Sequence, residues 1–150
     1  MATTLNLYDQ WRDNVADPAR AAAVAGTLKC AIVTGAYTVD QNLHDFWNDV
    51  NANEVSGTNY TAGGNACASP TWTGPDGAGL LTFDASDSAT WLQSGTGFSN
   101  GRRAIFYYDT GVTTTSRLVA YTADFGADSG NVAGDFSVAI NAAGIYTSPR

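Results

Sequence analysis

The chain has 150 residues and a formal net charge of −7, and 44% of its residues are hydrophobic while only 14% are charged. This length fits one domain, and the apolar content excludes a disordered chain. The acidic balance without a basic patch excludes electrostatic binding of nucleic acid, and the longest apolar stretch, residues 21–26, is far shorter than the ~20 residues of a membrane-spanning helix.

The first predicted element is an amphipathic helix within residues 4–16. Leu7, Trp11 and Val15 recur every four residues, which places them on one face of a helix. Pro18 ends the pattern because the residue before a proline is pushed out of the helical region. We therefore expect a short N-terminal helical arm over residues 1–27. Its three apolar side chains form a candidate interface, either with a neighbouring subunit or shell or with the protein's own β domain.

A strand and a short helical segment follow the arm. Residues 28–34 form an apolar, β-branched run that Gly35 ends, which is typical of a buried strand. Residues 40–50 carry apolar side chains at helical spacing (Leu43, Phe46, Trp47 and Val50), with Asp40 as a plausible cap. They predict a single short helix or two turns between strands.

From residue 51 onward, short apolar runs alternate with turn residues about every ten positions. This spacing is typical of a sandwich or barrel of short strands. In residues 103–108, Ile105 and Tyr107 fall on one face and Phe106 and Tyr108 on the other, so both faces of that strand must be covered, by the body or by a partner. The strands are expected near residues 53–56, 59–61, 68–73, 80–84, 89–92, 103–109, 116–125, 136–139 and 145–147.

These elements predict a mainly β protein. We expect a single β-sandwich or jelly-roll-like domain over residues 28–150, preceded by the helical arm over residues 1–27.

The residues that carry most enzyme and metal chemistry are scarce. The chain has one His (His44), one Lys (Lys29), one Glu (Glu54) and two cysteines, Cys30 and Cys67. Zinc needs about four ligands, and no nucleophile motif surrounds His44, whose neighbour Asp40 predicts a surface contact. Cys30 lies in an apolar run and reads as a small buried hydrophobe, with a Cys30–Cys67 bridge as the alternative. We expect no catalytic residues, no metal site and no cofactor.

Three other polar segments predict turns instead of binding sites. Asp84–Ser88 lacks the ligand pattern of a calcium loop, and the carboxylate pair Asp124 and Asp128 near Gly126 brings too few ligands for a metal. Gly63–Gly64 does not lead from a strand into a helix, so a bulge or tight bend is expected there and not a phosphate loop.

The aromatic residues allow two interpretations. Exposed rings of Trp11, Trp47, Trp72 and Trp91 would suit a glycan-binding module, because sugars stack on aromatic faces. The alternative is that these rings fill a small core and its protein contacts.

Five blocks, in order and at similar spacing, resemble a family of small virion proteins encoded by tailed bacteriophages. They are NEVSGTNYTAGG (53–64), TFDASD (82–87), RRAIFYYDTG (102–111), LVAYTADFG (118–126) and GDFSVAINAAGI (134–145). An N-terminal strand like KCAIVTGAYT (29–38) and a helical turn precede them in the family, so the resemblance covers residues 28–147. It implies a structural component of the particle with a β-sandwich body.

The resemblance, with the low charge and the β pattern, predicts a capsid decoration (cement) protein that binds and stabilises the assembled head shell. Its expected partners are the major capsid protein and further copies of itself, as a homo-oligomer such as a trimer, with no nucleic acid and no membrane. It is expected on the capsid surface of the virion after synthesis in the host cytoplasm. The alternatives are a neck or tail component and a glycan-binding host-attachment module.

Overall fold

The protein is mainly β. The computed structural model describes residues 2–3, 5–9, 11, 26–73, 80–88 and 90–149. In this part of the chain, strands dominate, and the helical elements with defined bounds are two single turns of 3-10 helix. No helix among these residues is long and apolar enough to cross a membrane.

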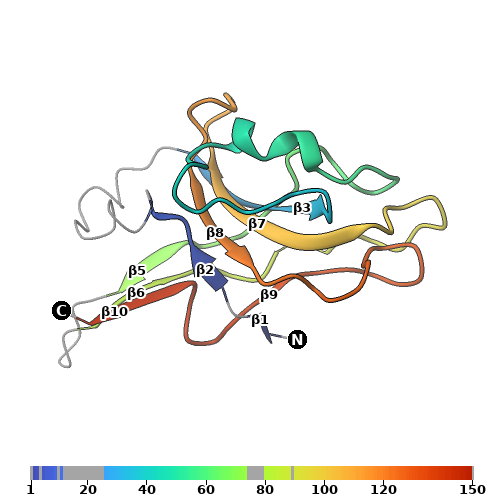
Figure 1. The fold of residues 1–150 in the computed structure, drawn as a ribbon. Helices are drawn as coiled ribbons and strands as arrows, with labels where there is room; N and C mark the ends of the chain where they lie inside the picture. The colour runs from blue at the N-terminus through green and yellow to red at the C-terminus, as the bar shows by residue number, and fades with distance from the viewer. Residues whose placement is uncertain are drawn as a thin grey trace.

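A five-stranded antiparallel sheet forms the centre of the molecule (Figure 1). Its spatial order is β2–β8–β7–β3–β4, and the long strands β3 and β7 pair from Thr27↔Asp109 to Thr34↔Gly101. The strands are β2 (Leu5–Leu7), β3 (Thr27–Thr34), β4 (Asn65–Ala66), β7 (Gly101–Asp109) and β8 (Leu118–Thr122).

Two smaller sheets complete the strand pairing of the described residues. A three-stranded antiparallel sheet has the order β10–β6–β5, and a parallel pair joins β1 to β9. The strands are β1 (Ala2–Thr3), β5 (Thr71–Thr73), β6 (Leu80–Asp84), β9 (Ala139–Ile140) and β10 (Tyr146–Pro149). In Figure 1 the three-stranded sheet forms a separate layer beneath the central sheet.

Both faces of the central sheet are buried, as the alternation in residues 103–108 predicts. Phe106 and Tyr108 belong to one core cluster, and Ile105 and Tyr107 belong to the other. All four side chains are at most 5% exposed. The protein's own body therefore supplies the cover on both sides of β7.

The core cluster on the Phe106 side joins the central sheet to the three-stranded sheet. Phe83 of β6 is fully buried and lies 6.4 Å from Tyr108 of β7 between ring centroids. Trp11 fits beside both rings, 5.6 Å from Tyr108 and 5.9 Å from Phe83. Trp91 and Phe98 extend the same cluster from the loops that follow β6.

The core cluster on the Tyr107 side is covered by the segment between β3 and β4. This segment carries the 3-10 turns η1 (Trp47–Asp49) and η2 (Asn51–Asn53), which lie on the face of the sheet away from β5, β6 and β10 (Figure 1). Trp47 and Val50 are its main buried side chains. Trp47 N–H donates to Ser116 O at 2.8 Å, so the cover is tied to the loop before β8.

The predicted N-terminal helical arm is not seen among the described residues, which corrects that expectation for residues 5–7, although Asp9 and Trp11 have helical backbone. Leu5–Leu7 form a strand that pairs with β8 in the register Leu5↔Thr122. The open edge of β8 offers unpaired backbone groups, and pairing with them outweighs a weak helical preference. Residues 12–25, including Val15, lie outside the described residues.

The segment 40–50 forms two separate turns and not a single short helix, so the second of the two expected alternatives is the one present. Its helical part is confined to the turn η1, and Leu43, which was expected on the apolar face, is 75% exposed. Asp40 does not cap η1, whose N-cap residue is Phe46. Its Oδ1 instead accepts the N–H groups of Asn42 and Leu43 at 3.1 Å, which closes a separate turn at residues 41–43. A side chain that binds nearby backbone N–H groups favours such a turn over a continuous helix.

The strand predictions were right where runs were long. Residues 80–84 form β6 as expected, the run 103–109 covers most of β7, and the run 116–125 contains the whole of β8. The runs 53–56 and 59–61 are not strands, because they lie between the end of η2 and the start of β4. The run 89–92 contributes one isolated β-bridge, Trp91↔Phe136. Short runs lack the alternation needed to select a partner strand.

Candidate binding pocket

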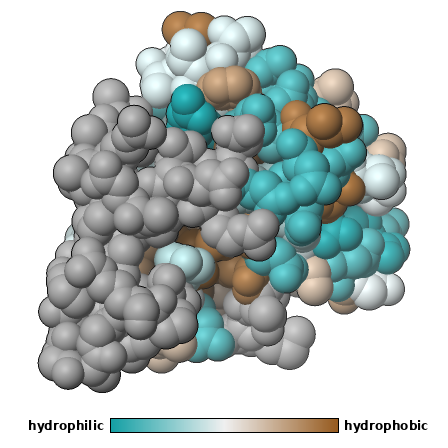
Figure 2. Space-filling view, turned by 60° about the vertical axis from the view of Figure 1, so that its left-hand side comes forward, coloured by the Kyte–Doolittle hydropathy of each residue, from teal (hydrophilic) through white to brown (hydrophobic). Residues whose placement is uncertain are grey.

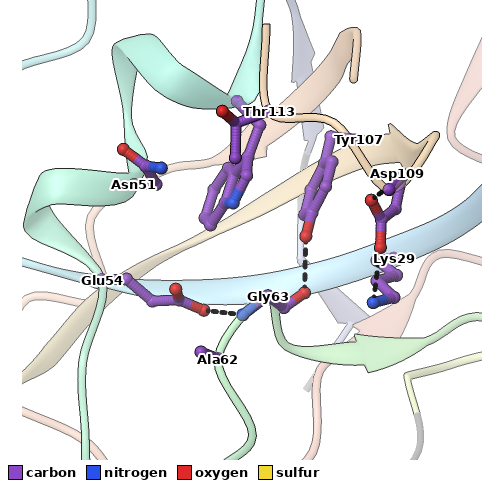
Figure 3. Close-up of a pocket in the computed structure, with 10 residues that line it drawn as sticks. Lys29, Asn51, Glu54, Ala62, Gly63, Tyr107, Asp109 and Thr113 are labelled. Atoms are coloured by element: carbon purple, nitrogen blue, oxygen red, sulfur yellow. Dashed lines mark hydrogen bonds and ion pairs between the residues drawn. The ribbon is translucent and has the colours of Figure 1, made fainter. Parts of the chain in front are cut away.

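A pocket of about 330 Å³ opens at the end of the central sheet where β3 and β7 meet η2 (Figure 3). Glu54 lies on one side of Gly63 and Lys29 on the other. The pocket therefore brings together the only Glu and the only Lys of the chain. Its lining residues are Lys29, Trp47, Asn51, Glu54, Ala62, Gly63, Tyr107, Asp109, Gly111 and Thr113.

Strand register sets the back of the pocket. Lys29 of β3 is the direct cross-strand partner of Tyr107 in β7, and Asp109 follows two residues later on the same face of β7. Residues at i and i+2 of a strand share a face, so Asp109 lies within reach of Lys29.

An aromatic pair forms one rigid wall. The rings of Trp47 and Tyr107 stack with 4.4 Å between centroids and 3° between planes. Tyr107 OH donates to Gly63 O at 2.7 Å, so the ring is held on one face by Trp47 and at its hydroxyl by Gly63. Burial raises the pKa of Tyr107, so the phenol stays a neutral donor at neutral pH.

The carboxylate of Glu54 is held by one of its oxygens. Glu54 Oε1 accepts the hydroxyl of Tyr60 and the N–H of Gly63, each at 2.7 Å. Glu54 Oε2 has no hydrogen-bond partner among the described residues. Burial raises the pKa of Glu54 above its ordinary value, while the two donors and Lys29 act in the opposite direction.

Lys29 and Asp109 form an ion pair across the other side of the pocket. Lys29 Nζ lies 2.6 Å from Asp109 Oδ2, and both side chains are about one-quarter exposed (26% and 25%). The hydrogen bond from Lys29 lowers the pKa of Asp109, and the N–H of Gly111 lowers it further. One donor of the ammonium group is used in this pair, and an ammonium group has three.

The floor of the pocket is a glycine turn. Gly63 and Gly64 both have positive φ, at 88° and 72°. A Cβ on Gly64 would collide with the carbonyl oxygen of Cys30, so the turn packs directly on the backbone of β3. This close contact presents the N–H and C=O of Gly63 to Glu54 and Tyr107, and it confirms the predicted tight bend.

The pocket is suited to binding. It offers a carboxylate oxygen, an ammonium group, the amide of Asn51 and the hydroxyl of Thr113 around an aromatic wall. No group of three or more metal-binding side chains occurs in the part of the chain that the structure describes.

The candidate interface residues are not brought together on one helical face. Leu7 is half-buried on the edge strand β2, Trp11 is 2% exposed within the Phe83 cluster, and Val15 lies outside the described residues. The burial of Trp11 agrees with the second expectation for the N-terminal segment, that it packs on the protein's own β domain. A docking role for Leu7 and Val15 stays a prediction.

Other residues that the sequence singled out have structural partners. His44 Nδ1 faces the hydroxyl of Tyr37 at 2.9 Å and the N–H of Asp40 at 3.3 Å. Cys30 and Cys67 are free and buried, and burial raises the pKa of both thiols, to about 12 for Cys67. This confirms the interpretation of Cys30 as a small buried hydrophobe.

Residues 85–87 do not form the predicted turn, whereas the chain does bend near Gly126, whose N–H donates to Asp124 Oδ1 at 2.8 Å. Asp84 Oδ1 accepts the N–H of Ala85, and Asp87 Oδ1 accepts the N–H of Ile140. Asp124 and Asp128 both pair with Arg102, at 2.8 and 3.4 Å.

Three of the four tryptophans are buried, which bears on the glycan interpretation. Trp11, Trp47 and Trp91 are at most 4% exposed, so none presents a free ring face for a sugar. The side chain of Trp72 is outside the described residues.

Sequence reasoning missed Lys29 and Glu54 as neighbours. Their rarity was the available signal, because a chain that retains a single Lys and a single Glu has few reasons to keep them except a specific contact. No family model, curated protein or solved structure matches this chain.

Proposed function

We propose that this chain is a structural protein of a tailed-phage virion, a capsid decoration protein that binds and stabilises the assembled head shell. In this proposal the five- and three-stranded sheets are the two layers of a β-sandwich or jelly-roll-like domain. The partners are the major capsid protein and further copies of the chain, as a homo-oligomer such as a trimer on the capsid surface.

One observation carries the proposal: the long charged side chains of the described residues are all held by the protein itself. Lys29 pairs with Asp109, and Glu54 is bonded to Tyr60 and Gly63. The arginines are held as well: Arg102 pairs with two aspartates, Arg103 donates to Thr122 O and Arg117 lies 5.2 Å from the ring of Phe46.

Burying such a surface against another protein has a low cost in free energy. A free Lys or Glu side chain loses ~1.5–2 kcal/mol of rotamer entropy when it is immobilised, and its charge must be desolvated. Protein interfaces are depleted in Lys and Glu for these reasons. The remaining exposed residues are mostly Thr, Ser, Asn, Gly and Asp, which cost less to order.

Isolated apolar side chains supply candidate contact points. Leu43, Leu92 and Val112 are 75%, 60% and 55% exposed, each on a loop or turn. Figure 2 shows one face as mainly hydrophilic with separate hydrophobic patches among the described residues. Small apolar anchors surrounded by polar groups are typical of protein interfaces.

The blocks that resemble phage virion proteins form the framework of the domain. RRAIFYYDTG is most of β7 with its turn, LVAYTADFG begins with β8, and NEVSGTNYTAGG holds Glu54, Tyr60 and the glycine turn. The resemblance therefore falls on core strands and on one built turn, which supports a shared fold.

Copy number in purified particles of the phage that encodes this chain tests the proposal. Quantitative mass spectrometry should find hundreds of copies per particle, and a cryo-electron microscopy map should place them on the head lattice. Six or twelve copies on the neck or tail axis would replace the decoration role with that of a neck or tail component. Absence from the virion would overturn both.

A further inference from the structure

The pocket between Glu54 and Lys29 has hydrogen-bonding groups that the protein leaves unused. Glu54 Oε2 faces no donor among the described residues, and the amide of Asn51 and the hydroxyl of Thr113 make no side-chain hydrogen bond there. Lys29 uses one of its three N–H donors, on Asp109. Figure 3 shows these groups around one opening, with Asn51 and Thr113 across from Gly63.

The charges around the opening disfavour an anionic ligand, because Glu54 and Asp109 outweigh Lys29. Lys29 opposes an incoming cation, and Glu54 with Asp109 opposes an incoming anion. The Lys29–Asp109 pair is neutral as a unit, which leaves Glu54 as an acceptor beside ammonium and amide donors. A hydroxyl group both donates and accepts, so it matches a site where donors and acceptors alternate.

The pocket is small and its walls are preformed. Its volume of about 330 Å³ is near the lower end of the usual range for ligand sites, ~300–1,000 Å³. The stacked Trp47 and Tyr107 and the Gly63 turn keep their places without a ligand, because each is fixed by contacts inside the protein. A preformed site loses little conformational entropy on binding.

We infer that this pocket binds a neutral, hydroxyl-rich ligand, a single sugar unit of a glycan. Glu54 Oε2 accepts from one sugar hydroxyl, Lys29 donates to a neighbouring one, and Asn51 and Thr113 contact the ring substituents. Specificity comes from hydrogen bonds and not from an exposed aromatic platform, because Trp47 is buried in its stack with Tyr107. This inference does not depend on a position in the virion.

A glycan array probed with the full chain tests the inference, followed by nuclear magnetic resonance titration with the neutral monosaccharide of the best glycan. The variant Glu54→Gln keeps an oxygen for Tyr60 and Gly63 but replaces the free acceptor with an amide donor. It should weaken binding roughly tenfold or more. Asp124→Asn, an exposed carboxylate outside the pocket, is the matched control and should bind as the unaltered chain does.

A second variant keeps the test decisive if Glu54→Gln does not fold. Thr113→Val alters only an exposed turn residue, so it should fold normally and bind a neutral sugar more weakly. The inference would be overturned if the chain bound no neutral glycan, or if it preferred charged sugars to neutral ones. It would also be overturned if Glu54→Gln and Thr113→Val, as far as each folds, bound the sugar as strongly as the unaltered chain. None of these results would change the copy number in the particle, so the two proposals fail separately.

Discussion

Tyr60 donates a hydrogen bond from its hydroxyl to Glu54 Oε1 over 2.7 Å, and the same hydroxyl accepts the backbone N–H of Ile32 at 3.0 Å. One phenol therefore connects the carboxylate of the pocket to the backbone of β3. The ring itself lies in the core beside Trp91, 5.7 Å away between centroids. Burial and the neighbouring Glu54 raise the pKa of Tyr60, so the hydroxyl stays protonated at neutral pH.

Tyr60→Phe should lower the free energy of unfolding by ~1–3 kcal/mol, because it removes a bond to a carboxylate and leaves the N–H of Ile32 unpaired. Chemical denaturation measures the change. Tyr121→Phe is the control, since it removes only an exposed bond to Gln41 and should stay within ~0.5 kcal/mol. Equal effects of the two variants would mean that Tyr60 has no special role in linking Glu54 to the sheet.

The pKa of Glu54 predicts a specific pH dependence. A carboxyl whose folded pKa lies above its unfolded pKa binds more protons in the folded state between these two values. Its contribution to stability therefore falls as the pH rises through that window, which starts near the ordinary value of 4.5. Glu54→Gln does not titrate, so its stability relative to the unaltered chain should increase over the same window and stay constant above it.

Carbon-13 labelling of glutamate checks this directly, because the chain has one Glu and yields one side-chain carboxyl signal. The midpoint of its titration should lie above 4.5. Asp109→Asn is the control for the stability curve. The pKa of Asp109 is lower in the folded chain than in the unfolded chain. Asp109→Asn should therefore be less stable than the unaltered chain at a pH above the unfolded pKa of Asp109. This difference should disappear as the pH falls through the folded pKa.

Lys29 and Asp109 should show a small, salt-sensitive coupling. Both side chains are about one-quarter exposed, so solvent screens the pair and the coupling should be ~0.2–1 kcal/mol. A double-mutant cycle of Lys29→Met and Asp109→Asn measures it at low and high salt. A coupling of several kcal/mol that salt does not change would contradict the screening expected for a pair that is one-quarter exposed.

Trp11→Ala should destabilise the domain by ~3–5 kcal/mol, because the indole is 2% exposed between Tyr108 and Phe83. Leu43→Ala, at a side chain that is 75% exposed, should change stability by at most ~0.5 kcal/mol. Thermal unfolding compares the two. A folded, stable Trp11→Ala chain that no longer binds particles would restore the docking role first expected for this residue.

The exposed apolar loop residues should matter for particle binding and not for folding. Leu92→Lys and Val112→Lys place a mobile charge where a contact is proposed, so each should lower occupancy on heads assembled without the chain. Thr96→Lys, on another exposed loop position, tests whether any added charge has this effect. Full occupancy in both Leu92→Lys and Val112→Lys would exclude these two loops from the interface.

Local sequence patterns determined the strands and their faces. The alternation of Ile105 and Tyr107 with Phe106 and Tyr108 predicted a strand that is buried on both sides, and Gly63–Gly64 predicted a tight bend that is present. These features depend on neighbours along the chain, since side-chain direction in a strand alternates with period two and turns depend on one or two residues.

Only the tertiary structure decided the pocket and the form of the N-terminal segment. Lys29 meets Asp109 because β3 pairs with β7 in an unbroken register from Thr27 to Val33, although the two strands are distant in sequence. Glu54 joins them through the turn that packs on Cys30. Leu5–Leu7 became a strand because β8 offered an open edge. Such contacts depend on which backbone groups remain unpaired after the sheet assembles, and no local periodicity records that.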